Sequence, residues 1–107
     1  MVYTIEQLQE RIVPVAEKYG LRSVWVYGSY ARNEATDDSD VDFLIDKTGS
    51  SVRGWIIGGV YEDLCDSVGK KVDLLTVGSL DENRRQEMYP RLKENVYRER
   101  KILYERQ

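Results

Sequence analysis

Three aspartates stand at spacings that could bring their carboxylates together. Asp40 and Asp42 lie two residues apart in a predicted strand over residues 40–45, so both side chains project from the same face. Asp73 stands among apolar residues in another predicted strand, over 71–77. If these strands are neighbours, the three carboxylates converge, and their repulsion raises at least one pKa unless a cation neutralises them. Such oxygen ligands suit Mg²⁺, which keeps waters and takes substrate phosphates as further ligands.

A phosphate-binding turn is predicted shortly before these acids. Gly28 and Ser29 stand where a β-rich run over 23–27 ends and a brief helix over 29–35 is expected. Glycine lets another group approach the backbone, free N–H groups at a helix start hold phosphate oxygens, and the serine hydroxyl adds a donor. Arg32 fits either a phosphate contact or a salt bridge to Glu34 or a nearby aspartate. A phosphate cradle beside metal-binding carboxylates indicates phosphoryl or nucleotidyl transfer.

Histidine is absent from the chain, which removes several classes of enzyme. Serine–histidine hydrolases, cysteine–histidine proteases and histidine-ligated zinc sites are all excluded. The 107 residues, 41% hydrophobic and 33% charged, predict one globular domain over 1–107. No apolar run approaches the ~20 residues of a membrane span, and the N-terminus has no secretory pattern. The lone Cys65, expected to be a buried small hydrophobe, suits a reducing compartment, so we expect a cytoplasmic protein.

The first and last helices carry start signals that can be read from side chains. Thr4 and Gln7 form a predicted capping box, and Pro14 is expected to kink the helix that follows. A second capping box is expected at Ser79 and Glu82. The last helix is expected to be kinked at Pro90 and lined by Met88, Leu92 and Val96.

Strands are expected over 23–27, 40–45 and 71–77, with helices before, between and after them. The link between the second and third strands is long enough for a parallel crossover containing a helix over 57–68. Residues 102–104 fit either a docked strand or more helix, while Trp25 and Trp55 are expected in the core or an interface. The expected order is helix, strand, helix, strand, helix, strand, helix: an α/β (α+β) fold with a small sheet flanked by helices.

At its polar residues the chain resembles the DNA polymerase beta-like nucleotidyltransferase superfamily. The hallmark of that superfamily is Gly-Ser, ten residues, then Asp-x-Asp, which is present here as Gly28-Ser29 and Asp40-Val41-Asp42. Length and element order are similar to those of the minimal, stand-alone members (MNT), over nearly the whole chain. The resemblance implies a mixed sheet, two Mg²⁺ ions on Asp40, Asp42 and Asp73, and a nucleotide triphosphate, usually that of ATP, held by Gly28 and Ser29.

One residue departs from the pattern of the superfamily. Asn33 stands where many relatives have glycine. Asparagine tolerates left-handed backbone better than most other residues, so the match is little weakened.

The same resemblance implies a partner. MNT proteins act as antitoxins beside a small all-helical HEPN ribonuclease toxin, which they inhibit by transferring AMP from ATP onto a tyrosine. In this interpretation the partner's tyrosine hydroxyl is the nucleophile, and Mg²⁺ with one aspartate, Asp73, takes its proton.

Two alternatives stay open from the sequence. The chain could neutralise a helical partner by occlusion alone, or it could transfer nucleotides to a small hydroxylated molecule or an RNA 3′ end. The basic stretch over 84–106 is the feature that leans towards RNA. Acids such as Glu94 and Glu99 are interleaved with its basic residues, which favours a solvated helix face instead.

Overall fold

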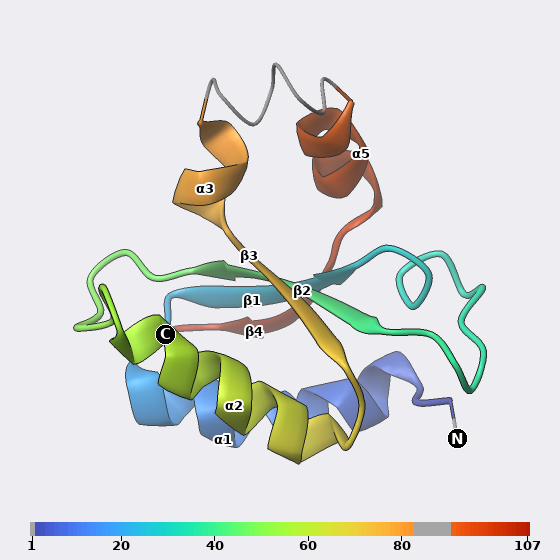
Figure 1. Cartoon of the computed structure of the whole chain (residues 1–107), viewed down its shortest axis with the longest axis horizontal. Helices are drawn as coiled ribbons and strands as arrows, with labels where there is room; N and C mark the ends of the chain where they lie inside the picture. Colours follow the sequence, from blue (N-terminus) through green and yellow to red (C-terminus); the bar gives the residue numbers. More distant parts are fainter. Residues whose placement is uncertain (1, 83–90) are drawn as a thin grey trace.

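A mixed four-stranded sheet forms the centre of the fold in the computed structural model, which describes residues 2–82 and 91–107. Its strands are β1 (Ser23–Tyr27), β2 (Val41–Asp46), β3 (Val72–Thr76) and β4 (Lys101–Glu105). They lie in the order β3-β2-β1-β4 (Figure 1). The β1 strand is antiparallel to β2 and β4, whereas β2 and β3 are parallel.

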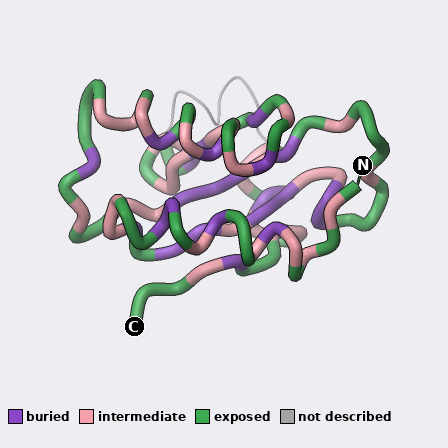
Figure 2. Tube along the Cα trace, turned by 90° about the horizontal axis from the view of Figure 1, so that it is seen from below, coloured by how far each residue is buried: buried purple, intermediate pink, exposed green. Residues whose placement is uncertain are grey.

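Helices cover both faces of this sheet. The long helices α1 (Ile5–Tyr19) and α2 (Ile56–Val68) lie on one face, and the short helices α3 (Val77–Asp81) and α5 (Leu92–Glu99) stand on the other (Figure 1). Buried and exposed positions alternate along the chain, as expected for amphipathic elements (Figure 2). The fold therefore has two apolar cores, one on each side of the sheet.

The two faces of β2 differ in chemistry, and this difference positions the acids. Val41, Phe43 and Ile45 are fully buried in the core beneath α1 and α2. Because side chains alternate along a strand, Asp42 and Leu44 project to the opposite face, where Leu44 packs in the smaller core with residues of α3 and α5. The carboxylate of Asp42 is thus placed on the side of the sheet that the short helices flank.

Several expectations from the sequence are confirmed. The fold is a small mixed sheet flanked by helices, and α2 provides the parallel crossover between β2 and β3. The Thr4 side chain accepts a hydrogen bond from the Gln7 N–H at 3.1 Å, and the Thr4 N–H donates to the Gln7 side chain at 2.9 Å. Residues 102–104, which fitted a strand or a helix, lie in the edge strand β4.

The element order differs from expectation between β1 and β2, and again at the C-terminus. Residues 28–33 form turns rather than a helix, because Asn33 adopts a left-handed φ of +60° that a continuing helix would not allow. The chain ends in a strand, so the last expected helix is followed by β4. The start of that helix at Met88 and Pro90 falls outside the described residues.

Smaller corrections concern single side chains. No capping box forms at Ser79 and Glu82, because Thr76 caps α3 by accepting from the Ser79 N–H at 3.1 Å. Pro14 lies inside α1, which continues beyond it to Tyr19, and the expected kink stays a prediction. Trp55 is not a core residue, since 88% of its surface is exposed.

Two further expectations concern the burial of Cys65 and membrane-spanning segments. Cys65 is only partly buried, although it packs against the larger core. Across residues 2–82 and 91–107, the structure holds no helix with the length and apolar character to cross a membrane.

Adjacent residues of β4 provide a matched test of this strand. Leu103 is 3% exposed and belongs to the larger core, whereas Ile102 is 43% exposed. We expect Leu103→Ala to lower the free energy of unfolding in urea by ~2–5 kcal/mol, because it leaves a cavity. Ile102→Ala is expected to cost under ~1 kcal/mol. Equal losses for the two variants would contradict the placement of this strand.

Candidate active site

Asp42 and Asp73 lie side by side on neighbouring strands. The parallel register of β2 and β3 pairs them directly, and Asp40 immediately precedes β2. Burial, then the negative charges of Asp73 and Asp40, raise the pKa of Asp42 to about 6. The positive charge of Arg32 opposes this rise. The structure therefore brings Asp42 and Asp73 together, while Asp40 is near enough for its charge to act on Asp42.

The oxygen atoms of these carboxylates are suitable ligands for a magnesium ion, but they do not surround it on all sides. Within residues 2–82 and 91–107, no three acidic or cysteine side chains gather closely enough to hold a metal ion. Mg²⁺, however, commonly binds through one or two carboxylates and completes its shell with waters and substrate phosphates. The pair formed by Asp42 and Asp73 supplies that smaller set of oxygens, and Asp40 adds charge nearby.

Gly28 presses the backbone of the turn after β1 against Asp42. Its φ is +71°, and a Cβ atom at this position would collide with the Oδ2 atom of Asp42. The turn is closed by a hydrogen bond from the Arg32 N–H to the Gly28 carbonyl, 3.0 Å long, and by one from the Glu34 N–H to the Ser29 carbonyl, 2.9 Å long. Only glycine satisfies both the left-handed backbone and the contact with the carboxylate.

Asp73 is open to solvent, as Asp40 is, whereas Asp42 is partly buried. The Asp73 Oδ2 atom accepts a hydrogen bond of 3.3 Å from the Tyr27 hydroxyl. Tyr27 is itself buried in the smaller core at the end of β1. The tyrosine therefore orients a carboxylate that an outside molecule can still reach.

Glu99 is a site residue that the sequence did not reveal. Its Oε2 atom accepts hydrogen bonds from the Gly28 N–H at 3.1 Å and from the Arg32 Nη1 at 2.6 Å. Glu99 thus holds two groups expected to bind phosphate, and the Gly28 N–H is not free. Arg32 also pairs with Glu34 at 3.3 Å, which was the predicted salt bridge.

One wall of this site comes from α5. A cavity of about 460 Å³ is bordered by Gly28, Ser29, Arg32, Asp40 and Asp42 on one side and by α5 on the other. The helix contributes residues spaced to lie on one of its faces: Leu92, Asn95, Val96 and Glu99. That spacing is the signal in the sequence that could have placed Glu99 in the site rather than on a solvated face.

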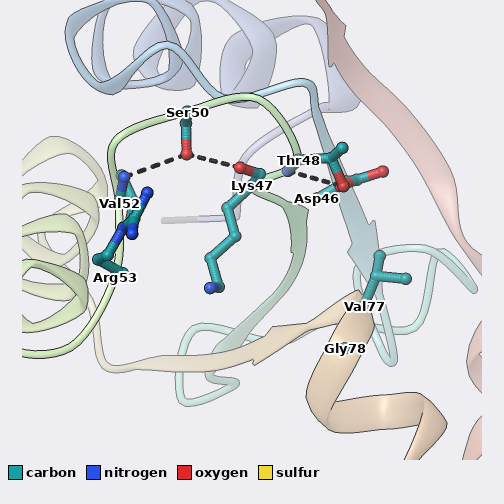
Figure 3. Close-up of a pocket in the computed structure, with 8 residues that line it drawn as sticks. All are labelled: Asp46, Lys47, Thr48, Ser50, Val52, Arg53, Val77 and Gly78. Atoms are coloured by element: carbon teal, nitrogen blue, oxygen red, sulfur yellow. Dashed lines mark hydrogen bonds between the residues drawn. The ribbon is translucent and has the colours of Figure 1, made fainter.

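A larger cavity lies at the other end of β2 and β3. It measures about 550 Å³ and is lined by the loop after β2 and the start of α3 (Figure 3). Its one acidic lining residue, Asp46, accepts a hydrogen bond from the Thr48 N–H at 2.9 Å and lies 3.9 Å from Arg22. With its carboxylate held by these groups and no second acid beside it in the lining, this cavity does not have the chemistry of the acidic site.

Comparison with known proteins identifies relatives of this chain. The family model for the nucleotidyltransferase domain matches residues 10–104, which include every site residue described above. A candidate protein adenylyltransferase of Methanocaldococcus jannaschii is 33% identical over 96 residues, which cover 89% of this chain and 92% of that protein.

Two solved structures share the fold. One is a toxin–antitoxin complex with AMP-PNP, with a TM-score of 0.69 and 17% identity over 92% of this chain and 74% of the other. The second is a complex of a tri-AMPylated HEPN toxin of Shewanella oneidensis with its MNT antitoxin. Its TM-score is 0.64, with 15% identity over 97% of this chain and 75% of the other.

Gly28→Ala tests the contact between the turn and Asp42. We expect a loss of ~1–2 kcal/mol from left-handed strain, with a further ~1–3 kcal/mol from the collision. Gly20→Ala is the matched control, because Gly20 has a φ of +65° but open space where its Cβ would lie. Urea unfolding of both variants measures the difference, and equal losses would show that Asp42 does not press on Gly28.

Asp42 predicts a pH dependence of stability in metal-free buffer. A carboxyl with a raised folded-state pKa favours folding when protonated, and that contribution is lost as the pH rises from 3.8 to about 6. The stability of the wild type relative to Asp42→Asn should therefore fall across this range and then level off. Urea unfolding at several pH values checks this, and a constant or rising difference would refute it.

Proposed function

This chain belongs to the nucleotidyltransferase domain family, and from its site we propose that it transfers AMP from ATP to a tyrosine of a HEPN ribonuclease toxin. By that transfer it would act as an antitoxin in the cytoplasm. The observation that carries the proposal is the contact of the Gly28 turn with Asp42, which is paired in register with Asp73. This contact joins a phosphate-binding backbone to a carboxylate pair in one site.

The turn and Arg32 bind the triphosphate in this proposal. The Gly28 N–H and the Ser29 hydroxyl are donors at the end of β1, and the Arg32 guanidinium adds a positive charge on the same cavity. The side of the cavity formed by α5 then lies against the rest of the nucleotide. Arg32 and the turn thereby fix the α-phosphate near Asp42.

The reaction is a substitution at the α-phosphorus. The acceptor hydroxyl oxygen forms a bond to that phosphorus, the bond to the bridging oxygen breaks, and pyrophosphate leaves with the electron pair. Asp73 takes the hydroxyl proton, because it is exposed to an incoming partner and oriented by Tyr27. Two Mg²⁺ ions bound at Asp40, Asp42 and Asp73 would supply positive charge that stabilises the charge developing on the phosphates.

The proposed acceptor is supported by the relatives and by the exposure of Asp73. One neighbour in fold is a complex with AMP-PNP, and another contains an AMPylated HEPN toxin. Transfer to RNA receives less support, because basic side chains near the C-terminus are engaged within the chain. Arg100 stacks on Trp25 and Tyr97, and Arg106 donates to the Gly20 carbonyl.

Transfer of label tests the proposed reaction. The chain is incubated with ATP labelled in its α-phosphate, Mg²⁺ and the protein encoded beside it, and we expect label on a tyrosine of that protein. Asp42→Asn should reduce transfer at least ~100-fold, because it removes charge at the centre of the carboxylate site. The exposed Glu94→Gln, which removes the same charge outside the cavity, should transfer label like the wild type.

Inhibition of the partner separates catalysis from occlusion. If Asp42→Asn still binds the partner and still blocks its ribonuclease activity, the chain acts by covering its partner. Label that appears on a small molecule or on RNA, but not on the protein, would contradict the proposed acceptor while leaving nucleotidyl transfer intact.

A further inference from the structure

A single carboxylate oxygen occupies the phosphate-binding donors of the site. The Glu99 Oε2 atom lies 2.6 Å from the Arg32 Nη1 and 3.1 Å from the Gly28 N. The Gly28 N–H was expected to hold phosphate, and a phosphate contact was one of the two roles expected of Arg32. The hydrogen bond to Glu99, followed by the charge of Glu99, also raises the pKa of Arg32 above its ordinary value. The ion pair is therefore the dominant interaction of Arg32.

The position of Glu99 is fixed by the helix that precedes it and the strand that follows it. Glu99 is the last residue of α5, and β4 begins two residues later by pairing Lys101 with Val26 of β1. Gly28 follows directly after β1, so the β1–β4 pairing brings Glu99 to the turn. Only 20% of the Glu99 side chain is exposed. The contact is thus built by secondary structure and does not depend on a loosely placed surface side chain.

We propose that Glu99 is an internal competitor of the triphosphate, which must displace it from Gly28 and Arg32 to bind. The inference rests on the proposed function, since it assumes that these donors receive phosphate. A carboxylate and a phosphate both present anionic oxygens, and one set of donors cannot satisfy both at once. Glu99 consequently selects for ligands with enough phosphate charge to replace it.

The negative charge of the cavity lining also opposes the binding of an anionic ligand. Asp40, Asp42 and Glu99 line the cavity, whereas Arg32 is its one basic lining residue within the described chain. Removing the charge of Glu99 while keeping its shape should therefore help an anionic ligand and leave an uncharged one unaffected. This difference separates a competitor from a residue that merely shapes the site.

The packing of α5 has other supports. Val96 is 2% exposed in the smaller core, and the Tyr97 hydroxyl donates to the Asp81 Oδ1 at 3.2 Å. Lys93 forms an ion pair with the same Asp81 oxygen, also at 3.2 Å. These contacts anchor the helix to α3, so a substitution at Glu99 that keeps its size should leave the fold in place.

The test compares Glu99→Gln with Glu94→Gln, which removes an equal charge from an exposed position of the same helix. Calorimetry measures the binding of AMP-PNP with Mg²⁺, and separately of adenosine, to each full-length protein. We expect Glu99→Gln to bind AMP-PNP ~10-fold more tightly than the wild type. The wild type must break the ion pair between Glu99 and Arg32 to bind the nucleotide, and the variant has no such ion pair to break. Adenosine binding should not change in either variant, and Glu94→Gln should resemble the wild type.

Other outcomes overturn the inference. Equal or weaker binding of AMP-PNP by a folded Glu99→Gln protein would show that Glu99 organises the turn instead of competing. If Glu99→Gln does not fold, Glu99→Asp replaces it, because its shorter side chain keeps the charge but cannot span the same distance; it too should bind AMP-PNP more tightly. If neither the wild type nor either variant binds a nucleotide, the proposed function fails and the inference fails with it.

Discussion

The parallel, in-register pairing of β2 and β3 is the constraint on which the rest of the site depends. It places Asp42 beside Asp73, and the burial of Asp42 makes the resulting repulsion costly. The apolar side chains on the opposite face of β2 hold that strand against α1 and α2. The larger core therefore keeps the two like charges together, which is the arrangement that the proposed magnesium site requires.

Two neighbouring residues, Arg32 and Gly28, affect the aspartates, the first through its charge and the second through its small size. The positive charge of Arg32 opposes the rise in the pKa of Asp42, yet Glu99 holds Arg32 through an ion pair. Gly28 removes the steric barrier that would otherwise separate the turn from Asp42. Without a ligand, the chain thus satisfies the donors that are proposed to bind phosphate with the carboxylate of Glu99.

Much of the site could be predicted because its key residues lie close together in sequence. Gly28, Ser29 and Asp42 fall within one strand–turn–strand unit, in which the antiparallel pairing of β1 with β2 sets Tyr27 opposite Asp42. Asp73 needed one further inference, the parallel crossover, which the length of the intervening helix made readable. Glu99 could not be found in this way, because its contact with Gly28 spans 71 residues and depends on how β4 pairs with β1.

Local errors in the prediction have the same origin. The turn after β1 has helical hydrogen bonding, but Asn33 ends it with a left-handed backbone before a helix can form. Thr76, and not Ser79, caps the helix that follows β3, because β3 ends at Thr76 and α3 begins at the next residue. The sequence shows which residues could start or cap a helix. The pairing of distant strands then determines which of these residues do so in the fold.

The most direct test of this account is the pKa of the Asp42 carboxyl, followed by NMR with and without Mg²⁺ and AMP-PNP. The account predicts a value of about 6 in the metal-free protein and a clear fall when Mg²⁺ and the nucleotide are added together. Asp73→Asn should also lower the value without any metal, because it removes a neighbouring negative charge. A pKa that stays unchanged on adding Mg²⁺ and AMP-PNP would contradict the claim that this carboxylate pair is built to bind a cation with a nucleotide.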